Sequence, residues 1–182
     1  MNESKACMHK SKILLLGLDN SGKSSILISL QSNSNLLSHF SLNPTRGVNR
    51  QTIESEDLTM SIWDCGGQST YRQEHLQNFP IYKEGVEKII YVIDIQDKER
   101  YELALEFLKD LLDLIEEHKL DLKFSIFLHK YDPNLKKQEG FESIDDVLAT
   151  NLIPKIKSLM PSNMTYDIYK TSIFTVFQKE LA

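Results

Sequence analysis

The chain has 182 residues, of which 41% are apolar and 26% charged, a length and composition typical of one globular domain. Its formal net charge of −5 disfavours a dedicated nucleic-acid binder, because contacts with a phosphate backbone need clustered cations. Its longest apolar runs have four or five residues, whereas a membrane-spanning helix needs about 20. Cys7 and Cys65 form no closely spaced pair, so we expect neither a disulfide framework nor a zinc site, and a reducing cytoplasm as the location.

Six segments are predicted to be β-strands. Three are nearly continuous apolar runs, as expected of central strands covered on both faces, and two more alternating ones flank the acidic pair Glu56-Asp57, as in a hairpin. In chain order the predicted strands are 12–16, 48–55, 58–64, 89–95, 124–128 and 167–171. Because helical segments separate most of them, we predict an α/β fold: a mostly parallel six-stranded sheet with one antiparallel edge strand and helices on both faces.

Four helices are predicted between and after these strands. The first begins near Lys23, the second spans 100–118, where apolar residues recur at helical spacing, and the third spans about 144–160 despite Pro154. A short closing helix is expected after the last strand. No linker or repeat divides the chain, so we predict a short tail at 1–11 and a single domain at 12–182.

A phosphate-binding motif follows the first predicted strand. Residues 17–24 read GLDNSGKS and fit the pattern G-x-x-x-x-G-K-[ST] between a strand and a helix, the context that this motif requires. Its glycines let backbone amides face phosphate oxygens, Lys23 neutralises phosphate charge and Ser24 offers a hydroxyl to Mg²⁺. The alternative is a chance glycine-rich turn, which the flanking strand and helix disfavour.

Two further segments suit the same phosphate site. A predicted strand ends in the letters WDCGGQ, which would bring Asp64 near Mg²⁺, the Gly67 amide to the terminal phosphate and Gln68 to the attacking water. In the preceding loop, NPTRGVN, Thr45 offers a hydroxyl to Mg²⁺ and an amide to the same phosphate. Either segment alone would indicate a turn, but the upstream phosphate loop favours the functional interpretation.

With the phosphate loop, these segments resemble the Ras superfamily of small GTPases, and within it the Arf-like and Rag branches, over nearly the whole chain. The letters PTRGVN at 44–49 and the interval of 19 residues from Thr45 to Asp64 are similar to Arf proteins. The letters HKYD at 129–132 and TSI at 171–173 are similar to the guanine loops of Rag proteins. An early-branching or archaeal relative would combine both sets of features.

The resemblance implies a P-loop G domain that binds GTP or GDP with Mg²⁺. Asp132 would accept hydrogen bonds from guanine, the Lys130 stem would cover the base, and an amide near Ser172 would approach the guanine carbonyl. The implied catalytic residues are Gln68, Lys23 and Thr45. The implied Mg²⁺ ligands are Ser24 and Thr45, with Asp64 one layer further from the ion. The implied nucleotide contacts are Asp19, Asn20, Ser21, Gly22, Lys23, Ser24, Ser25, Thr45, Gly67, His129, Lys130, Asp132, Thr171, Ser172 and Ile173.

Two motif residues differ from those of most superfamily members, and two arginines lie in or beside the motifs. His129 stands where most members have Asn. This departure bears on the expected affinity for the base more than on the expected base specificity. Asp19 stands where Ras-type proteins have Gly, and is expected to obstruct an arginine supplied by an activator. Arg46 and Arg72 flank the two switch segments, which contain Thr45 and Gln68, and are interpreted as solvated surface charges without a catalytic role.

The sequence leaves more than one function open. The first is a Mg²⁺-dependent GTPase switch, slow on its own, whose exchange factor, activator and effectors bind at the switch segments. The second is a Rag-like interaction module with little hydrolysis, acting in a dimer or scaffold, and a small ATP-using kinase is less favoured. We expect a monomer or dimer, no nucleic-acid partner and no stable membrane anchor in this chain, so that it would meet membranes only through partners.

Overall fold

The computed structural model describes residues 9–31, 42–54 and 58–174. Within them lies a six-stranded sheet with the strand order β2-β3-β1-β4-β5-β6. The strands are β1 (His9–Gly17), β2 (Val48–Glu54), β3 (Leu58–Cys65), β4 (Val86–Asp94), β5 (Lys123–His129) and β6 (Tyr166–Lys170). Neighbouring strands are parallel except β2 and β3, which confirms the predicted sheet with one antiparallel edge strand.

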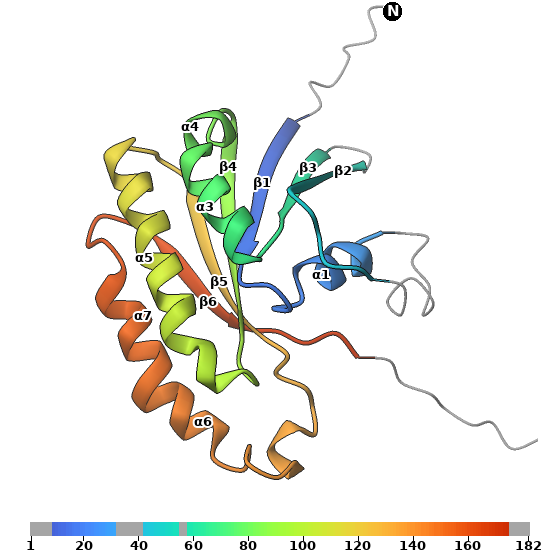
Figure 1. The fold of residues 1–182 in the computed structure, drawn as a ribbon, viewed down its shortest axis with the longest axis vertical. Coiled ribbons are helices and arrows are strands. Elements are labelled where there is room, and N and C mark those ends of the chain that lie inside the picture. The colour runs from blue at the N-terminus through green and yellow to red at the C-terminus, as the bar shows by residue number, and fades with distance from the viewer. Residues whose placement is uncertain (1–8, 32–41, 55–57, 175–182) are drawn as a thin grey trace, which may run out of the picture.

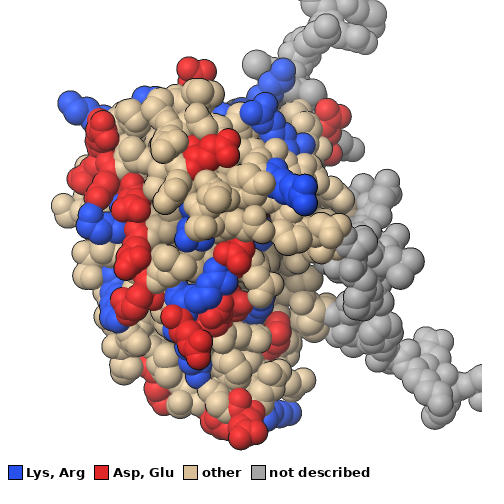
Figure 2. All heavy atoms as spheres, in the orientation of Figure 1, with Lys and Arg blue, Asp and Glu red and all other residues tan. Residues whose placement is uncertain are grey.

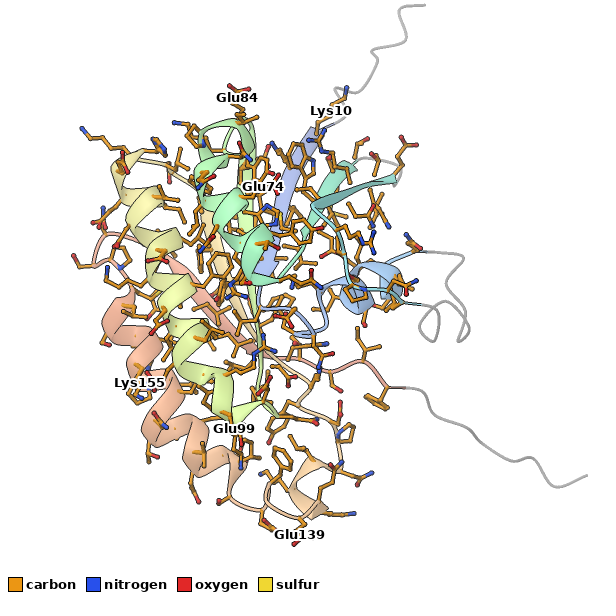
Figure 3. All side chains as sticks on the ribbon, in the orientation of Figure 1. Lys10, Glu74, Glu84, Glu99, Glu139 and Lys155 are labelled. Atoms are coloured by element: carbon orange, nitrogen blue, oxygen red, sulfur yellow. The ribbon has the colours of Figure 1, made fainter. Side chains whose placement is uncertain are left out.

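Helices lie on both faces of this sheet (Figure 1). One face carries α1 (Lys23–Ser29), and the other carries α3 (Ser69–Gln77), α4 (Phe79–Tyr82), α5 (Tyr101–Glu117), α6 (Ile144–Val147) and α7 (Ile153–Leu159). The amphipathic pattern predicted α5 to within a residue at each end. Lys155 of α7, labelled in Figure 3, pairs with Glu102 of α5. Among the described residues, no helix has the length and apolar character needed to cross a bilayer.

The sheet separates two groups of buried side chains. Leu14 belongs to the larger group, with α5 and α7, whereas the neighbouring Leu15 belongs to the smaller group, with Leu27 of α1. This alternation is the two-residue period of a strand. Each fully buried aliphatic side chain contributes about 1.5–3 kcal/mol through burial. β1 is therefore packed on both faces, and this packing fixes the point at which the loop after Gly17 begins.

The helix predicted at about 144–160 forms as three consecutive pieces. α6 runs into a π-helical turn (Leu148–Leu152), and α7 follows directly. Pro154 is the second residue of α7. Because it has no N–H, it cannot donate the usual helical hydrogen bond to the preceding turn. A single π turn is one way in which a helix absorbs such a change. The helix thus continues through Pro154 as predicted, with a local change of pitch.

Some sequence predictions cannot be compared with the structure, and one region escaped prediction. The hairpin turn at Glu56-Asp57 and the short closing helix lie outside the described residues. The helices α3 and α4 were not predicted, because α3 has a weak apolar periodicity and buries only His75 fully. Its position depends on contacts made by a polar side chain, which hydrophobic spacing does not reveal.

The carboxyl ends of β1, β3, β4 and β5 meet at one edge of the sheet (Figure 1). Three of the motifs singled out in the sequence follow β1, β3 and β5, and open α/β sheets bind their ligands at this edge. Figure 2 shows Lys and Arg interspersed with Asp and Glu over the face in view, without an extended patch of one sign.

Candidate nucleotide-binding site

The phosphate loop connects the end of β1 to the start of α1. Gly22 precedes the first residue of α1 with a φ of +92°, a left-handed conformation that side chains other than glycine rarely adopt. A Cβ atom at Gly22 would lie 2.4 Å from Cδ2 of His129. Glycine is therefore required here both by the backbone conformation and by the imidazole ring packed against it.

Lys23 points into this loop and is almost completely buried. Only 5% of it is exposed, and its Nζ donates hydrogen bonds to the carbonyl oxygens of Gly17 at 3.1 Å and Leu18 at 2.6 Å. Burial lowers the pKa of Lys23 to about 8, and the nearby charge of Asp64 partly opposes this shift. The ammonium group is thus held beside the loop amides, where the sequence motif predicts phosphate groups.

Ser24, Thr45 and Asp64 bring three oxygen atoms together from three parts of the chain. Asp64 Oδ2 accepts hydrogen bonds from Ser24 Oγ at 2.5 Å and from Thr45 Oγ1 at 3.0 Å, and the two hydroxyls are 2.9 Å apart. Asp64 is fully buried, and its Oδ1 has no hydrogen-bond partner among the described residues. Burial raises the pKa of Asp64, while the bonds from Ser24 and Thr45 oppose the rise.

This oxygen cluster has the chemistry of a magnesium site that is completed by phosphate. Mg²⁺ prefers oxygen ligands and is commonly held by one or two protein oxygens together with phosphates and waters. The described residues contain no group of three or more His, Cys, Asp or Glu side chains that would hold a metal by themselves. The two hydroxyls, backed by the Asp64 carboxylate, are oxygen atoms of the kind that can hold Mg²⁺ together with a phosphate.

A cavity of about 240 Å³ lies between the phosphate loop, the loop at 42–45 and the residues 67–68. Gly67 borders it and packs tightly against the loop, since a Cβ there would lie 2.1 Å from the Asp19 nitrogen. The exposed Gln68 follows, immediately before α3. The lining residues are Asp19, Asn20, Ser21, Gly22, Lys23, Ser24, Ser25, Leu42, Asn43, Pro44, Thr45, Gly67 and Gln68. The predicted phosphate and Mg²⁺ contacts from Asp19 to Ser25, with Thr45 and Gly67, line this cavity, whereas Gly17 and Asp64 do not.

The predicted base-binding residues gather next to this cavity, after β5 and β6. Asp132 accepts hydrogen bonds from Ser172 Oγ on one carboxylate oxygen and from Gln96 Nε2, at 3.1 Å, on the other. Lys130 has a left-handed φ of +63°, and its Nζ is 2.6 Å from Asp94 Oδ2. The loops after β4, β5 and β6 are therefore joined through charged and polar side chains around Asp132.

His129 links the base-binding loops to the phosphate loop. Its Nδ1 is 2.9 Å from Thr171 Oγ1, while the opposite edge of the ring packs against Gly22. Burial is the main reason that the pKa of His129 is lowered, and the Lys130 charge adds to the effect. The His found in place of the common Asn thus contacts both loops, with a neutral ring.

Arg72 corrects one expectation from the sequence. It was interpreted as a solvated surface charge, but its side chain is only 12% exposed and donates a 2.7 Å hydrogen bond to the Gly67 carbonyl. Arg72 also lies 3.8 Å from Asp19 Oδ1, and its guanidinium lies over the Phe107 ring. It is largely covered because Phe107 of α5 packs beneath it. Arg46, in contrast, is exposed as predicted.

Asp19 forms a second and shorter ion pair with Arg100, which precedes α5. Arg100 Nη2 is 2.6 Å from Asp19 Oδ1, and Arg100 Nη1 is 3.3 Å from Asp97 Oδ2. The carboxylate that replaces a small residue in the phosphate loop is therefore bound by two arginines of the same chain. Of these, the sequence pointed to Arg72 only as a surface charge and did not indicate Arg100 at all.

Two other residues at the site were missed from the sequence. His75 of α3 is 2% exposed, and its Nε2 lies 3.1 Å from the Gly66 carbonyl oxygen, so α3 is fastened to the loop after β3. Burial lowers the pKa of His75. Gln96 follows β4 at the edge where the other motifs lie, and that position was the one available signal for it.

The fold and the arrangement of these loops define a small G domain of the P-loop class. The sequence matches the family described as the Gtr1/RagA G protein conserved region over residues 12–179. The chain therefore belongs to this family, and the resemblance to Arf-like and Rag-like members of the Ras superfamily is confirmed.

Similar proteins agree with this assignment. The chain is 38% identical over 123 residues to ADP-ribosylation factor-like protein 3 of Caenorhabditis elegans, covering 66% of this chain and 61% of that protein. It is 34% identical over 128 residues to ADP-ribosylation factor J of Dictyostelium discoideum, covering 69% and 61%. The match thus spans about three fifths of the length of each relative. The solved structure of the Arl6 BBS3 small GTPase from Trypanosoma brucei with bound GppNp has the same fold, with a TM-score of 0.69, 20% identity and coverage of 90% and 87% of the two chains.

Proposed function

We propose that this chain is a guanine-nucleotide switch that binds GTP or GDP with Mg²⁺ and hydrolyses GTP slowly. The observation that carries the proposal is the meeting of Ser24, Thr45 and Asp64 within 2.5–3.0 Å. These residues belong to the phosphate loop, the loop before β2 and the end of β3. Because one bound phosphate–metal group would contact all three segments, its loss would release both switch segments together.

The residues would divide the work of binding. Lys23 and the amides of the phosphate loop would hold the β- and γ-phosphates, and Asp132 would select guanine through its ring N–H and exocyclic amine. Ser24 and Thr45 would hold Mg²⁺, with Asp64 accepting their hydrogen bonds. When bound, Mg²⁺ supplies positive charge to the phosphate oxygens. The Gly67 amide would contact the terminal phosphate, which ties the loop before α3 to the presence of GTP.

Partner proteins are the second half of this proposal. The loop at 42–47 and the start of α3 are the segments whose arrangement would depend on the terminal phosphate, so they are where exchange factors, activators and effectors would dock. We also propose that residues 12–182 act as the G domain. Binding of partners to these segments is the route by which the chain would reach membranes.

Identification of the bound nucleotide tests this function most directly. Matched samples of the purified protein would be loaded with GTP or with ATP in Mg²⁺, washed, denatured and analysed by chromatography. We expect GDP from the GTP-loaded sample and no retained adenine nucleotide. Intact GTP would support the interaction module with little hydrolysis instead, and retention of adenine nucleotide alone would reject the guanine site.

Gln68 provides the test of the hydrolysis step. Its exposed side chain stands at the rim of the cavity, so it would orient the attacking water only when the switch closes, and intrinsic turnover is expected to be slow, on the order of 10⁻⁴ s⁻¹. Gln68→Leu should lower single-turnover hydrolysis at least about tenfold while GDP affinity changes less than about twofold. Gln77→Leu, an exposed glutamine at the other end of α3, is the control. Equal rates for Gln68→Leu and the unchanged protein would remove this role.

A further inference from the structure

Gln96 lies in the loop after β4, and its side chain contacts the loop after β5. Its side-chain Nε2 donates hydrogen bonds to the Lys130 carbonyl oxygen at 2.8 Å and to Asp132 Oδ2 at 3.1 Å. Its own backbone N–H donates to Asp94 Oδ1 at 2.9 Å. The amide group of one glutamine thus spans the loop after β4 and the loop after β5.

The backbone holds Gln96 in the position needed for these bonds. The N–H of Ile95 donates to the His129 carbonyl at 3.1 Å, which extends the pairing of β4 with β5 by one residue. The turn at Lys130 has a left-handed φ of +63°, a conformation that is unfavourable for a residue other than glycine. By accepting a bond from Gln96, the Lys130 carbonyl gains a partner that favours this turn.

Both carboxylate oxygens of Asp132 accept hydrogen bonds from neighbouring side chains. Ser172 Oγ donates to Oδ1 and Gln96 Nε2 donates to Oδ2. An ionised carboxylate has about four acceptor positions, so each oxygen keeps one position for a ligand. Rotation of a carboxylate about its last torsion is otherwise weakly restricted. Two donors on opposite oxygens therefore fix the plane of the group.

We propose that Gln96 is a positioning residue for base specificity, an inference that rests on the proposed function. Guanine presents two parallel N–H donors, one on the ring and one on the exocyclic amine. A carboxylate held in a fixed plane offers one oxygen to each donor at the same time. Gln96 sets that plane, and it does so with the two hydrogens of a single amide, one for Lys130 and one for Asp132.

Two variants of nearly the same size separate this role from packing. Gln96→Met keeps the length of the side chain but removes both donors. Gln96→Glu keeps the shape, removes the donors and adds a negative charge facing Asp132, so its effect should be larger. Gln77→Glu, the same change at an exposed position on α3, is the matched control.

The measurement is competition of GDP, IDP and ADP against a fluorescent guanine nucleotide, with each variant checked by thermal unfolding without nucleotide. Inosine lacks the exocyclic amine, so the GDP-to-IDP affinity ratio reports the second hydrogen bond to Asp132. We expect Gln96→Met to lower GDP affinity about tenfold and Gln96→Glu about a hundredfold, with the GDP-to-IDP ratio falling in both and ADP affinity unchanged. Gln77→Glu should match the unchanged protein.

The outcomes distinguish this inference from the function beneath it. If the unchanged protein does not prefer GDP over ADP, the guanine switch itself is rejected, and the role of Gln96 with it. If the unchanged protein prefers GDP and both Gln96 variants keep its GDP-to-IDP ratio, only the role of Gln96 is overturned. An equal loss of GDP, IDP and ADP affinity would also overturn it, because it would indicate a structural effect on the whole site.

Discussion

Asp132→Asn is expected to move the base preference of the site from guanine to xanthine. Guanine would donate two hydrogen bonds to the Asp132 carboxylate, and a bond to a charged group is worth about 1.5–3 kcal/mol. Asn replaces one acceptor oxygen with an NH₂ donor, which faces the exocyclic amine of guanine unfavourably but can donate to the carbonyl that xanthine carries there. GDP affinity should fall on the order of 10³-fold, while affinity for xanthosine diphosphate should rise.

Competition between GDP and xanthosine diphosphate against a fluorescent guanine nucleotide measures this change. Asp146→Asn provides the control, because it makes the same change at an exposed carboxylate on α6. A GDP affinity for Asp132→Asn within about threefold of the unchanged protein would mean that Asp132 does not read the base. The ADP affinity of both variants should stay as weak as before.

Gly22→Ala is expected to abolish tight nucleotide binding. The substitution adds a Cβ at a φ of +92°, which is strained by about 1–2 kcal/mol, and places it 2.4 Å from the His129 ring. Both the phosphate loop and the base loop must then shift, because the clash joins the two. We expect GDP affinity to fall at least about a hundredfold, measured by titration of a fluorescent GDP analogue.

Two further variants isolate the clash from the strain. Gly140 has a similar φ of +82° with nothing within 4 Å of its would-be Cβ, so Gly140→Ala should lower stability slightly and leave binding intact. Adding His129→Ala to Gly22→Ala removes the ring that obstructs the new methyl group. Partial recovery of GDP affinity in the double variant is the expected result. No recovery, with His129→Ala alone still binding GDP, would show that backbone strain accounts for the loss.

The sequence predicted the strands and the phosphate side of the site well, because their signals are local. Apolar runs gave the strands to within about three residues, and the glycine spacing located the loop that Lys23 occupies. The motifs predicted Ser24 and Thr45 at Mg²⁺ with Asp64 one layer further from the ion, and the three side chains meet within 3.0 Å. Motifs of this kind are detectable because each residue has a defined chemical task.

The parts that could not be predicted depend on partners distant in the chain. Arg72 looks like a surface charge until α5 and the Phe107 ring are packed beneath it. Gln96 meets Asp132 36 residues away, and Arg100 meets Asp19 81 residues away. Neither pair has a sequence spacing that indicates contact. α3 was missed for a related reason, since its fully buried residue is His75 rather than an apolar stripe.

The sharing of Asp19 between Arg72 and Arg100 links the position of α3 to the electrostatic potential of the phosphate loop. Both arginines offset a negative charge that would otherwise repel an anionic ligand. A partner that draws α3 away takes Arg72 with it and leaves Asp19 with one arginine, so the loop becomes less attractive to phosphate. Coupling of this kind is reciprocal. An anionic ligand, which binds more tightly when Arg72 lies beside Asp19, therefore also favours the position of α3 seen here. Displacement of α3 in turn promotes release of that ligand.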